Sequence, residues 1–231
     1  YETFGSTSFL YVPAPNTKDP VVGMISFQDN LLFFTKNTKY VLYGSDLASF
    51  TLRESTGKKG ASSARAICKD DSYVYFSDDD SVYRFNGGTD QNISEKVDPT
   101  MDSIATQSSK FLTVHDDKLR LYYTQSGESF GRHCLIYDLK YNDWLRDTNV
   151  YGAVANIWDS QTDENELIVG NSRIGYLYYA EDGYSDVGRF IDFEYCTKYH
   201  SYDHPSRKHR IKRLYVFFRP GDYDYECDVQ I

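Results

Sequence analysis

Three observations predict that this sequence folds as an all-β protein. Tyr, Phe and Trp make up 16% of its 231 residues, and aromatic side chains favour the half-buried surface of a pleated sheet. A strand–turn–strand unit recurs at intervals of 42 to 47 residues, while the period of an amphipathic helix is nearly absent. Short strands repeated at such an interval are typical of the blades of a β-propeller.

Four copies of this unit follow one another along the chain. Each has a first strand rich in aromatic or aliphatic residues, a polar turn, and a second strand that contains Tyr. Phe34 and Phe76 are 42 residues apart, and Gly44 and Gly87 are 43 apart, so the first two copies align closely. The paired strands are 31–34 with 40–44, 73–76 with 82–87, 118–123 with 134–138, and 166–170 with 175–179.

Further elements accompany the paired strands. Residues 50–53 and 190–195 alternate between apolar and polar side chains and are candidates for outer strands. One short helix is expected at 99–105, because Asp98 suits the N-cap and Pro99 suits the first helical position. A β-sandwich remains the alternative fold, since it also spaces short strands regularly.

The repeats divide the chain into two parts. Residues 1–205 are predicted to form β-propeller-like blades, and four blades lie at the low end of the range that closes a ring. We therefore expect a partial propeller within a longer polypeptide. From residue 206 the pattern changes to a basic strand and a hairpin with its turn at 219–222, which we interpret as the start of a further β-domain.

Composition excludes several classes of protein. The net charge of −9 argues against broad affinity for a nucleic-acid backbone, which requires a basic surface. No uncharged apolar stretch approaches the length of a membrane-spanning helix. The cysteines at 68, 134, 196 and 227 are spaced too widely for zinc pairs or a small disulfide scaffold, and we expect free thiols from a reducing compartment.

Three short motifs are candidate chemical sites. Residues 127–131 match G-x-S-x-G, but they are predicted to lie in a turn between strands, where a hydrolase needs a strand, a turn and then a helix. Residues 78–80 are three Asp that fit a polar hairpin turn better than a calcium loop. Cys196, His200 and His204 are more consistent with a polar loop than with a zinc site. No catalytic, cofactor-binding or metal-binding residue is predicted, and no cofactor.

A basic segment near the C-terminal end contrasts with the acidic remainder of the chain. Its five fixed positive charges are a candidate subunit interface, at which the basic segment of one subunit meets an acidic face of another. Contact with DNA and a charged strand edge that prevents stray pairing are the alternatives. The five residues are Arg207, Lys208, Arg210, Lys212 and Arg213.

Several stretches together resemble a known family. They are residues 22–44, 68–88, 93–97, 175–179, 182–183, 186–188 and 195–198. They resemble the β-propeller region of structural proteins at the tail and head–tail junction of tailed bacteriophages, such as tail-tube or nozzle proteins and stabilisation proteins. The resemblance covers most of the chain through loosely repeated Phe, Tyr and Gly.

This resemblance implies a structural virion protein. It implies a ring of identical subunits that contacts neighbouring tail or connector proteins and surrounds a channel crossed by DNA as cargo. Such a protein would reside in the virion tail after assembly in the bacterial host cytoplasm, with no membrane partner. A carbohydrate- or receptor-binding propeller is the alternative, with Trp144 and residues 195–202 as places for a glycan. A propeller glycosidase is the second alternative.

Overall fold

A computed structural model gives the structure of the chain. It describes residues 19–45, 49–105, 110–159 and 165–180, all of which belong to one compact unit spanning residues 1–183. The predicted boundary at 205/206, the predicted strand at 190–195 and the predicted hairpin after 206 lie outside the described residues. These three expectations therefore stay predictions.

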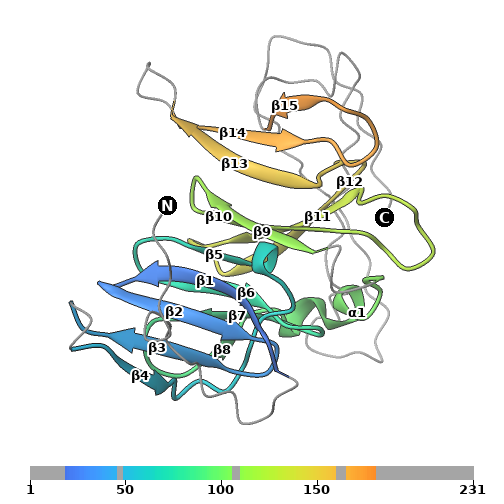
Figure 1. Cartoon of the computed structure of the whole chain (residues 1–231). Coiled ribbons are helices and arrows are strands. Elements are labelled where there is room, and N and C mark those ends of the chain that lie inside the picture. The colour runs from blue at the N-terminus through green and yellow to red at the C-terminus, as the bar shows by residue number, and fades with distance from the viewer. Residues whose placement is uncertain (1–18, 46–48, 106–109, 160–164, 181–231) are drawn as a thin grey trace, which may run out of the picture. The chain divides into compact units, whose positions relative to one another are not determined.

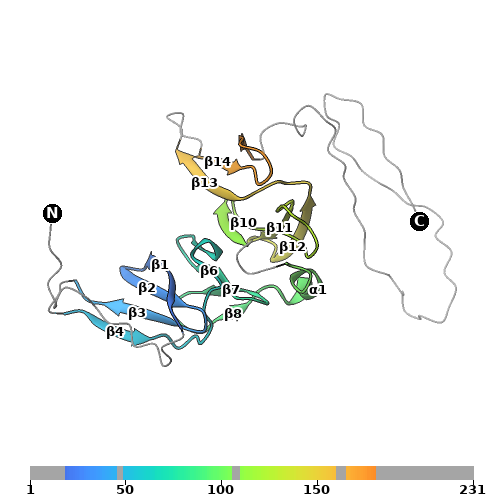
Figure 2. The same ribbon diagram turned by 45° about the vertical axis from the view of Figure 1, so that its right-hand side comes forward.

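The described residues form four separate antiparallel sheets, which confirms the all-β class (Figures 1 and 2). Within each sheet the strands follow chain order, so every strand pairs with the one before it. The first sheet contains β1 (Val21–Phe27), β2 (Asn30–Thr35), β3 (Lys39–Tyr43) and β4 (Thr51–Glu54). The second contains β5 (Ile67–Lys69), β6 (Val74–Ser77), β7 (Val82–Phe85) and β8 (Gln91–Asn92). The third contains β9 (Phe111–His115), β10 (Lys118–Tyr123), β11 (His133–Asp138) and β12 (Asp143–Thr148), and the fourth contains β13 (Val154–Asp159), β14 (Asn165–Gly170) and β15 (Leu177–Tyr179).

The four predicted strand pairs correspond to the second and third strands of the four sheets, β2–β3, β6–β7, β10–β11 and β14–β15. The outer strand predicted at 50–53 is β4, shifted by one residue. The sequence pattern did not reveal the first strand of any sheet. Each sheet therefore starts one strand earlier than the repeat suggested.

Apolar side chains fill the junctions between successive sheets. One buried cluster joins the first and second sheets through Phe34 of β2 and Phe76 of β6, whose ring centroids are 5.1 Å apart. A second cluster joins the second and third sheets, and a third joins the third and fourth sheets through Tyr122 and Val169. The inner strands of the second and third sheets consequently bury both of their faces.

This burial explains why the middle strands are almost continuously apolar. Along β6, Val74 and Phe76 face the first sheet, and Tyr75 between them faces the third. Along β11, Leu135 and Tyr137 pack towards the second sheet, while Cys134 and Ile136 pack towards the fourth. Successive side chains point to opposite faces of a strand, so a strand with two buried faces reads as an unbroken apolar run.

The predicted helix is present but shorter and shifted. Helix α1 spans Asp98–Met101 and follows a 3₁₀ turn, η2 (Glu95–Val97); another 3₁₀ turn, η1 (Ala64–Ala66), precedes β5. The assignment of Asp98 as N-cap was wrong, because Asp98 already has helical backbone angles and Val97 occupies the cap position. The helix ends early because Ile104 leaves it to form an extended bridge with Gln125.

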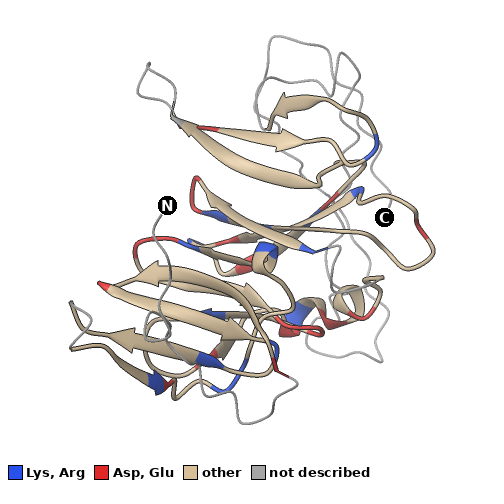
Figure 3. Ribbon diagram, in the orientation of Figure 1, with Lys and Arg blue, Asp and Glu red and all other residues tan. Residues whose placement is uncertain are grey.

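Charged residues lie largely in turns and at strand ends, with both signs interspersed (Figure 3). Among the described residues, Cys68 and Cys134 form no disulfide, in line with the expectation of reduced thiols, while Cys196 and Cys227 lie outside the described residues. Within the described part of the chain, no helix is long and apolar enough to cross a membrane.

Candidate functional site

The predicted subunit interface cannot be placed. Arg207, Lys208, Arg210, Lys212 and Arg213 lie outside the described residues. The same holds for residues 195–202 and for the Cys196, His200 and His204 motif. These assignments stay predictions, and the site built below comes from residues that the sequence pattern did not join.

A surface pocket of about 310 Å³ lies where three connecting segments meet at the junction of the third and fourth sheets. The first segment is the turn between β10 and β11, the second precedes β13, and the third is the turn between β14 and β15. The lining of the pocket combines charged, aromatic and hydroxyl side chains. The lining residues are Glu128, Ser129, Phe130, Arg132, Tyr151 and Arg173.

Glu128 is held from two sides. Its Oε1 atom lies 2.9 Å from Nε of Arg132, and its Oε2 atom lies 2.9 Å from Nε2 of His133. Partial burial by itself would raise the pKa of Glu128, but the hydrogen bond to His133 and the charges of His133 and Arg132 outweigh it and lower the pKa. The carboxylate therefore stays ionised and serves to anchor its neighbours.

The turn that carries Glu128 is fixed to the segment that follows helix α1. The backbone N–H of Ser126 donates to the carbonyl of Ser103, 2.8 Å away, and Gly127 takes a positive φ of 88° that favours glycine. His133, at the start of β11, is 5% exposed and stacks on Tyr123 with ring centroids 5.3 Å apart. The backbone hydrogen bond of Ser126 and the stacking of His133 on Tyr123 give Glu128 a defined position.

Arg173 enters the pocket from the turn between β14 and β15. The side-chain oxygen of Asn171 accepts hydrogen bonds from the backbone N–H groups of Arg173 and Ile174, at 2.8 and 3.1 Å, which closes the turn. The guanidinium carbon of Arg173 then lies 6.0 Å from the ring centroid of Tyr151. The hydroxyl of Ser172 donates to the carbonyl of Gly131, so this turn is tied to the β10–β11 turn.

The G-x-S-x-G sequence at 127–131 lies in the turn between β10 and β11, as predicted. The segment that follows it is strand β11, so the strand–turn–helix arrangement of a nucleophile elbow is absent from this place. Ser129 is exposed at the mouth of the pocket. Its position suits hydrogen bonding to a bound molecule.

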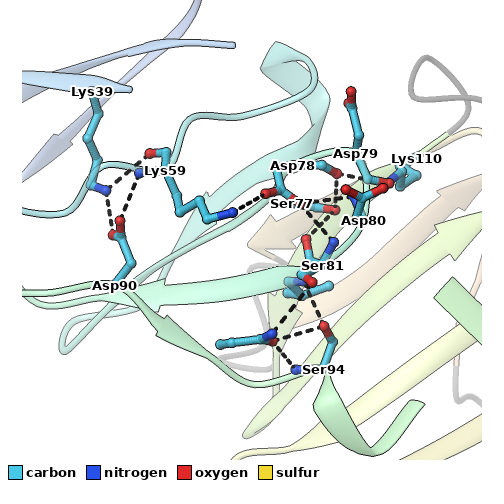
Figure 4. Close-up of polar contacts among 12 residues, drawn as sticks. Lys39, Lys59, Ser77, Asp78, Asp79, Asp80, Ser81, Asp90, Ser94 and Lys110 are labelled. Carbon is cyan, nitrogen blue, oxygen red and sulfur yellow. Dashed lines mark hydrogen bonds and ion pairs between the residues drawn. The ribbon is translucent and has the colours of Figure 1, made fainter. Parts of the chain in front are cut away.

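The three Asp at 78–80 form the predicted hairpin turn (Figure 4). A carboxylate oxygen of Asp78 accepts backbone hydrogen bonds from Asp80 and Ser81, at 3.0 and 2.8 Å. The ammonium group of Lys110 donates to the carbonyls of Asp78 and Asp79, at 2.8 and 2.6 Å. Burial lowers the pKa of Lys110, and the nearby acidic side chains oppose this shift. The turn thus binds a lysine of the chain itself. Among the described residues, no cluster of three or more Asp, Glu, His or Cys side chains is arranged to hold a metal ion.

A second buried lysine lies at the junction of the first two sheets (Figure 4). Lys39 is fully buried, forms an ion pair with Asp90 and lies 4.8 and 4.5 Å from the ring centroids of Phe76 and Phe85. Its ammonium group also donates to the carbonyl of Gly57, 3.3 Å away. Burial lowers the pKa of Lys39, whereas Asp90 opposes the shift. Every polar contact here is internal, which indicates a structural role.

Trp144, one of the predicted places for a glycan, is used in packing. Its indole N–H donates to the carbonyl of Ile93, 2.7 Å away, and its ring centroid lies 4.9 Å from that of Tyr137. The more exposed tryptophan is Trp158 on β13, with 58% of its surface accessible. No pattern in the sequence indicates which of the two tryptophans is the more exposed.

Neither known protein-family models nor curated protein sequences match this chain.

Proposed function

We propose that the four sheets are blades of a β-propeller, or of part of one. The observation that carries this proposal is the way in which successive sheets meet. The first strands adjoin in order, with β5 contacting both β1 and β9, and β9 contacting β13. Apolar clusters fill each junction between these sheets. A propeller arranges antiparallel four-stranded sheets radially around a channel, with the first strands innermost.

The outer faces of the first and fourth sheets are consistent with the same arrangement. On the fourth sheet, the face away from the third sheet carries Trp158, Leu177 and Tyr179, which are 58%, 75% and 54% exposed. On the first sheet, Met24 is 68% exposed. A propeller ring covers both terminal faces by closing, so the proposal requires further blades or neighbouring subunits to cover them.

We further propose that the chain is a structural component of a bacteriophage tail or head–tail connector. The sequence resemblance to tail-tube, nozzle and stabilisation proteins supports this role. The net charge of −9 also supports it, because an acidic channel wall would not retain passing DNA. In this role the chain assembles with identical subunits and with tail or connector proteins, in the host cytoplasm, and then resides in the virion.

Imaging and particle composition test this role together. Light scattering and negative-stain imaging of the full-length protein should show rings or tubes with a central hole. Mass spectrometry of purified phage particles should detect the protein at a fixed number of copies per particle. Absence of the protein from purified, infectious particles would refute the structural role.

A receptor-binding propeller is the second candidate, and the pocket beside Glu128 favours it. The glycosidase alternative has less support from the same pocket. Glycosidases act through a pair of carboxylates that flank the scissile bond. The residues that line the pocket include a single carboxylate, Glu128, which is held by Arg132 and His133.

A further inference from the structure

The pocket at the junction of the third and fourth sheets contains an excess of positive charge. Arg132 and Arg173 both line it, and Glu128 is the acidic lining residue. Both oxygens of Glu128 are occupied, one by Arg132 and the other by His133. The chain as a whole is acidic, so this local surplus of guanidinium groups has the opposite sign to the net charge.

Of the two arginines that line the pocket, Arg132 is paired with Glu128, whereas the described residues give Arg173 no acidic partner. The Asn171 side chain sets the backbone of its turn, and the Tyr151 ring lies 6.0 Å from its guanidinium carbon. Among the described residues, no Asp or Glu forms an ion pair with Arg173. A positioned guanidinium group is suited to bind a carboxylate through two parallel hydrogen bonds.

The other lining groups suit a hydroxylated ring. Phe130 is 45% exposed and offers an apolar surface for the face of a sugar, while the exposed Ser129 offers a hydroxyl that donates and accepts. A volume of about 310 Å³ lies at the small end of ligand sites, which hold about 300–1,000 Å³. This space fits one or two sugar units.

We propose that this pocket binds an acidic saccharide, with the sugar carboxylate on Arg173 and the sugar ring against Phe130. This inference goes beyond the proposed structural role, which requires no ligand. It also differs from the sequence-based expectation, which placed a glycan at Trp144 or at residues 195–202.

A matched pair of sugars tests the proposal. The full-length protein is titrated with methyl β-glucuronide and with methyl β-glucoside, which differ in the carboxylate, and binding is followed by calorimetry and saturation-transfer NMR. The expected dissociation constant for the glucuronide is about 1 mM, as befits a ligand of this size. The glucoside should bind about tenfold more weakly or not at all.

Two arginine variants provide the matched controls. Arg173→Ala should weaken glucuronide binding about tenfold or more. Arg53→Ala should leave it unchanged, although Arg53 lies over Tyr43 with the same 6.0 Å separation, because Arg53 belongs to the first sheet. Both arginines are exposed, so neither change should disturb folding.

Three results would overturn the proposal. They are no glucuronide binding, equal binding by the wild-type and Arg173→Ala proteins, and binding of propionate or inorganic phosphate as tight as that of the glucuronide. The last result would identify a site for simple anions. The composition of purified phage particles is measured separately, so failure of the saccharide site is distinguishable from failure of the structural role.

Discussion

The junction of the first two sheets and the junction of the last two both place a cation against aromatic rings, with opposite outcomes. Lys39 lies over Phe76 and Phe85, is fully buried and is neutralised by Asp90. The guanidinium carbon of Arg173 lies 6.0 Å from the ring centroid of Tyr151, but the Arg173 side chain is exposed. The first cation is enclosed by its own chain, and the second faces solvent.

This difference in burial distinguishes the structural charge of Lys39 from the charge of Arg173, for which we propose a binding role. A buried ammonium group must be satisfied internally, and carbonyls and one carboxylate surround Lys39. Around Arg173 the described residues supply an aromatic ring and a hydrogen-bonded turn, and the one acidic residue of the pocket, Glu128, is paired with Arg132 and His133. The two junctions therefore predict opposite consequences of substitution: a loss of stability at the first and a loss of binding at the last.

The largest expected effect comes from breaking the buried ion pair. In Lys39→Met the carboxylate of Asp90, whose side chain is 6% exposed, loses its counter-charge. Removing one partner of a buried pair costs about 3–5 kcal/mol, because it leaves an uncompensated charge in the interior. Urea denaturation followed by circular dichroism measures the change in the free energy of unfolding.

An exposed ion pair of the same residue types is the control for this change. Lys96 lies 3.0 Å from Asp143, and the two side chains are 65% and 67% exposed. Exposed pairs contribute about 0.2–1 kcal/mol, so Lys96→Met should have little effect. Equal losses in the two variants would show that Lys39 is not an enclosed structural charge.

A smaller effect is expected from filling a tight space at the last junction. A Cβ atom at Gly152 would lie 2.3 Å from the ring of Tyr122, which is buried and stacked on Phe111 with centroids 4.4 Å apart. Overpacking of this kind costs about 1–3 kcal/mol, so Gly152→Ala should lower the urea midpoint.

Gly175→Ala, in the turn between β14 and β15, is the matched control. No atom lies within 4 Å of the position that its Cβ would take, and no positive φ is required there. This variant should unfold within about 0.5 kcal/mol of the wild type. A large loss at Gly175, or none at Gly152, would contradict the packing described for this junction.

Among the strands predicted from the sequence, the most continuously apolar are those with two buried faces. The runs 73–76 and 134–137 are apolar throughout, and their burial on both sides explains the pattern. The first strands were missed because β5 has only three residues, Ile67–Lys69, and β9 and β13 mix polar with apolar side chains. Their strand character depends on the pairing partner.

The pocket could not be predicted, because its parts are distant in the sequence. Glu128, Tyr151 and Arg173 come from three segments that meet only when the third and fourth sheets pack together. The turn at 127–131 was predicted from its glycines, but no local pattern marks Arg173 as a partner. For Lys39 one sign was available: it stands two residues before Val41 and so shares the inward face of β3.

The smallest expected effect is the loss, at acidic pH, of the stability that ionised Glu128 contributes to the pocket. The folded state lowers the pKa of Glu128 below its ordinary value of 4.5 through His133 and Arg132, which outweigh burial. The ionised carboxylate therefore contributes stability that is fully present above pH 4.5 and is lost as the pH falls through the folded pKa. Urea denaturation of wild-type and Glu128→Gln proteins from about pH 6 to pH 3 should show the wild-type advantage shrinking with acid. A difference that stays constant over this range would show that Glu128 stabilises the turn without its charge. Arg132 and His133 would then need another anchor, and the positioning assigned to Glu128 would be wrong.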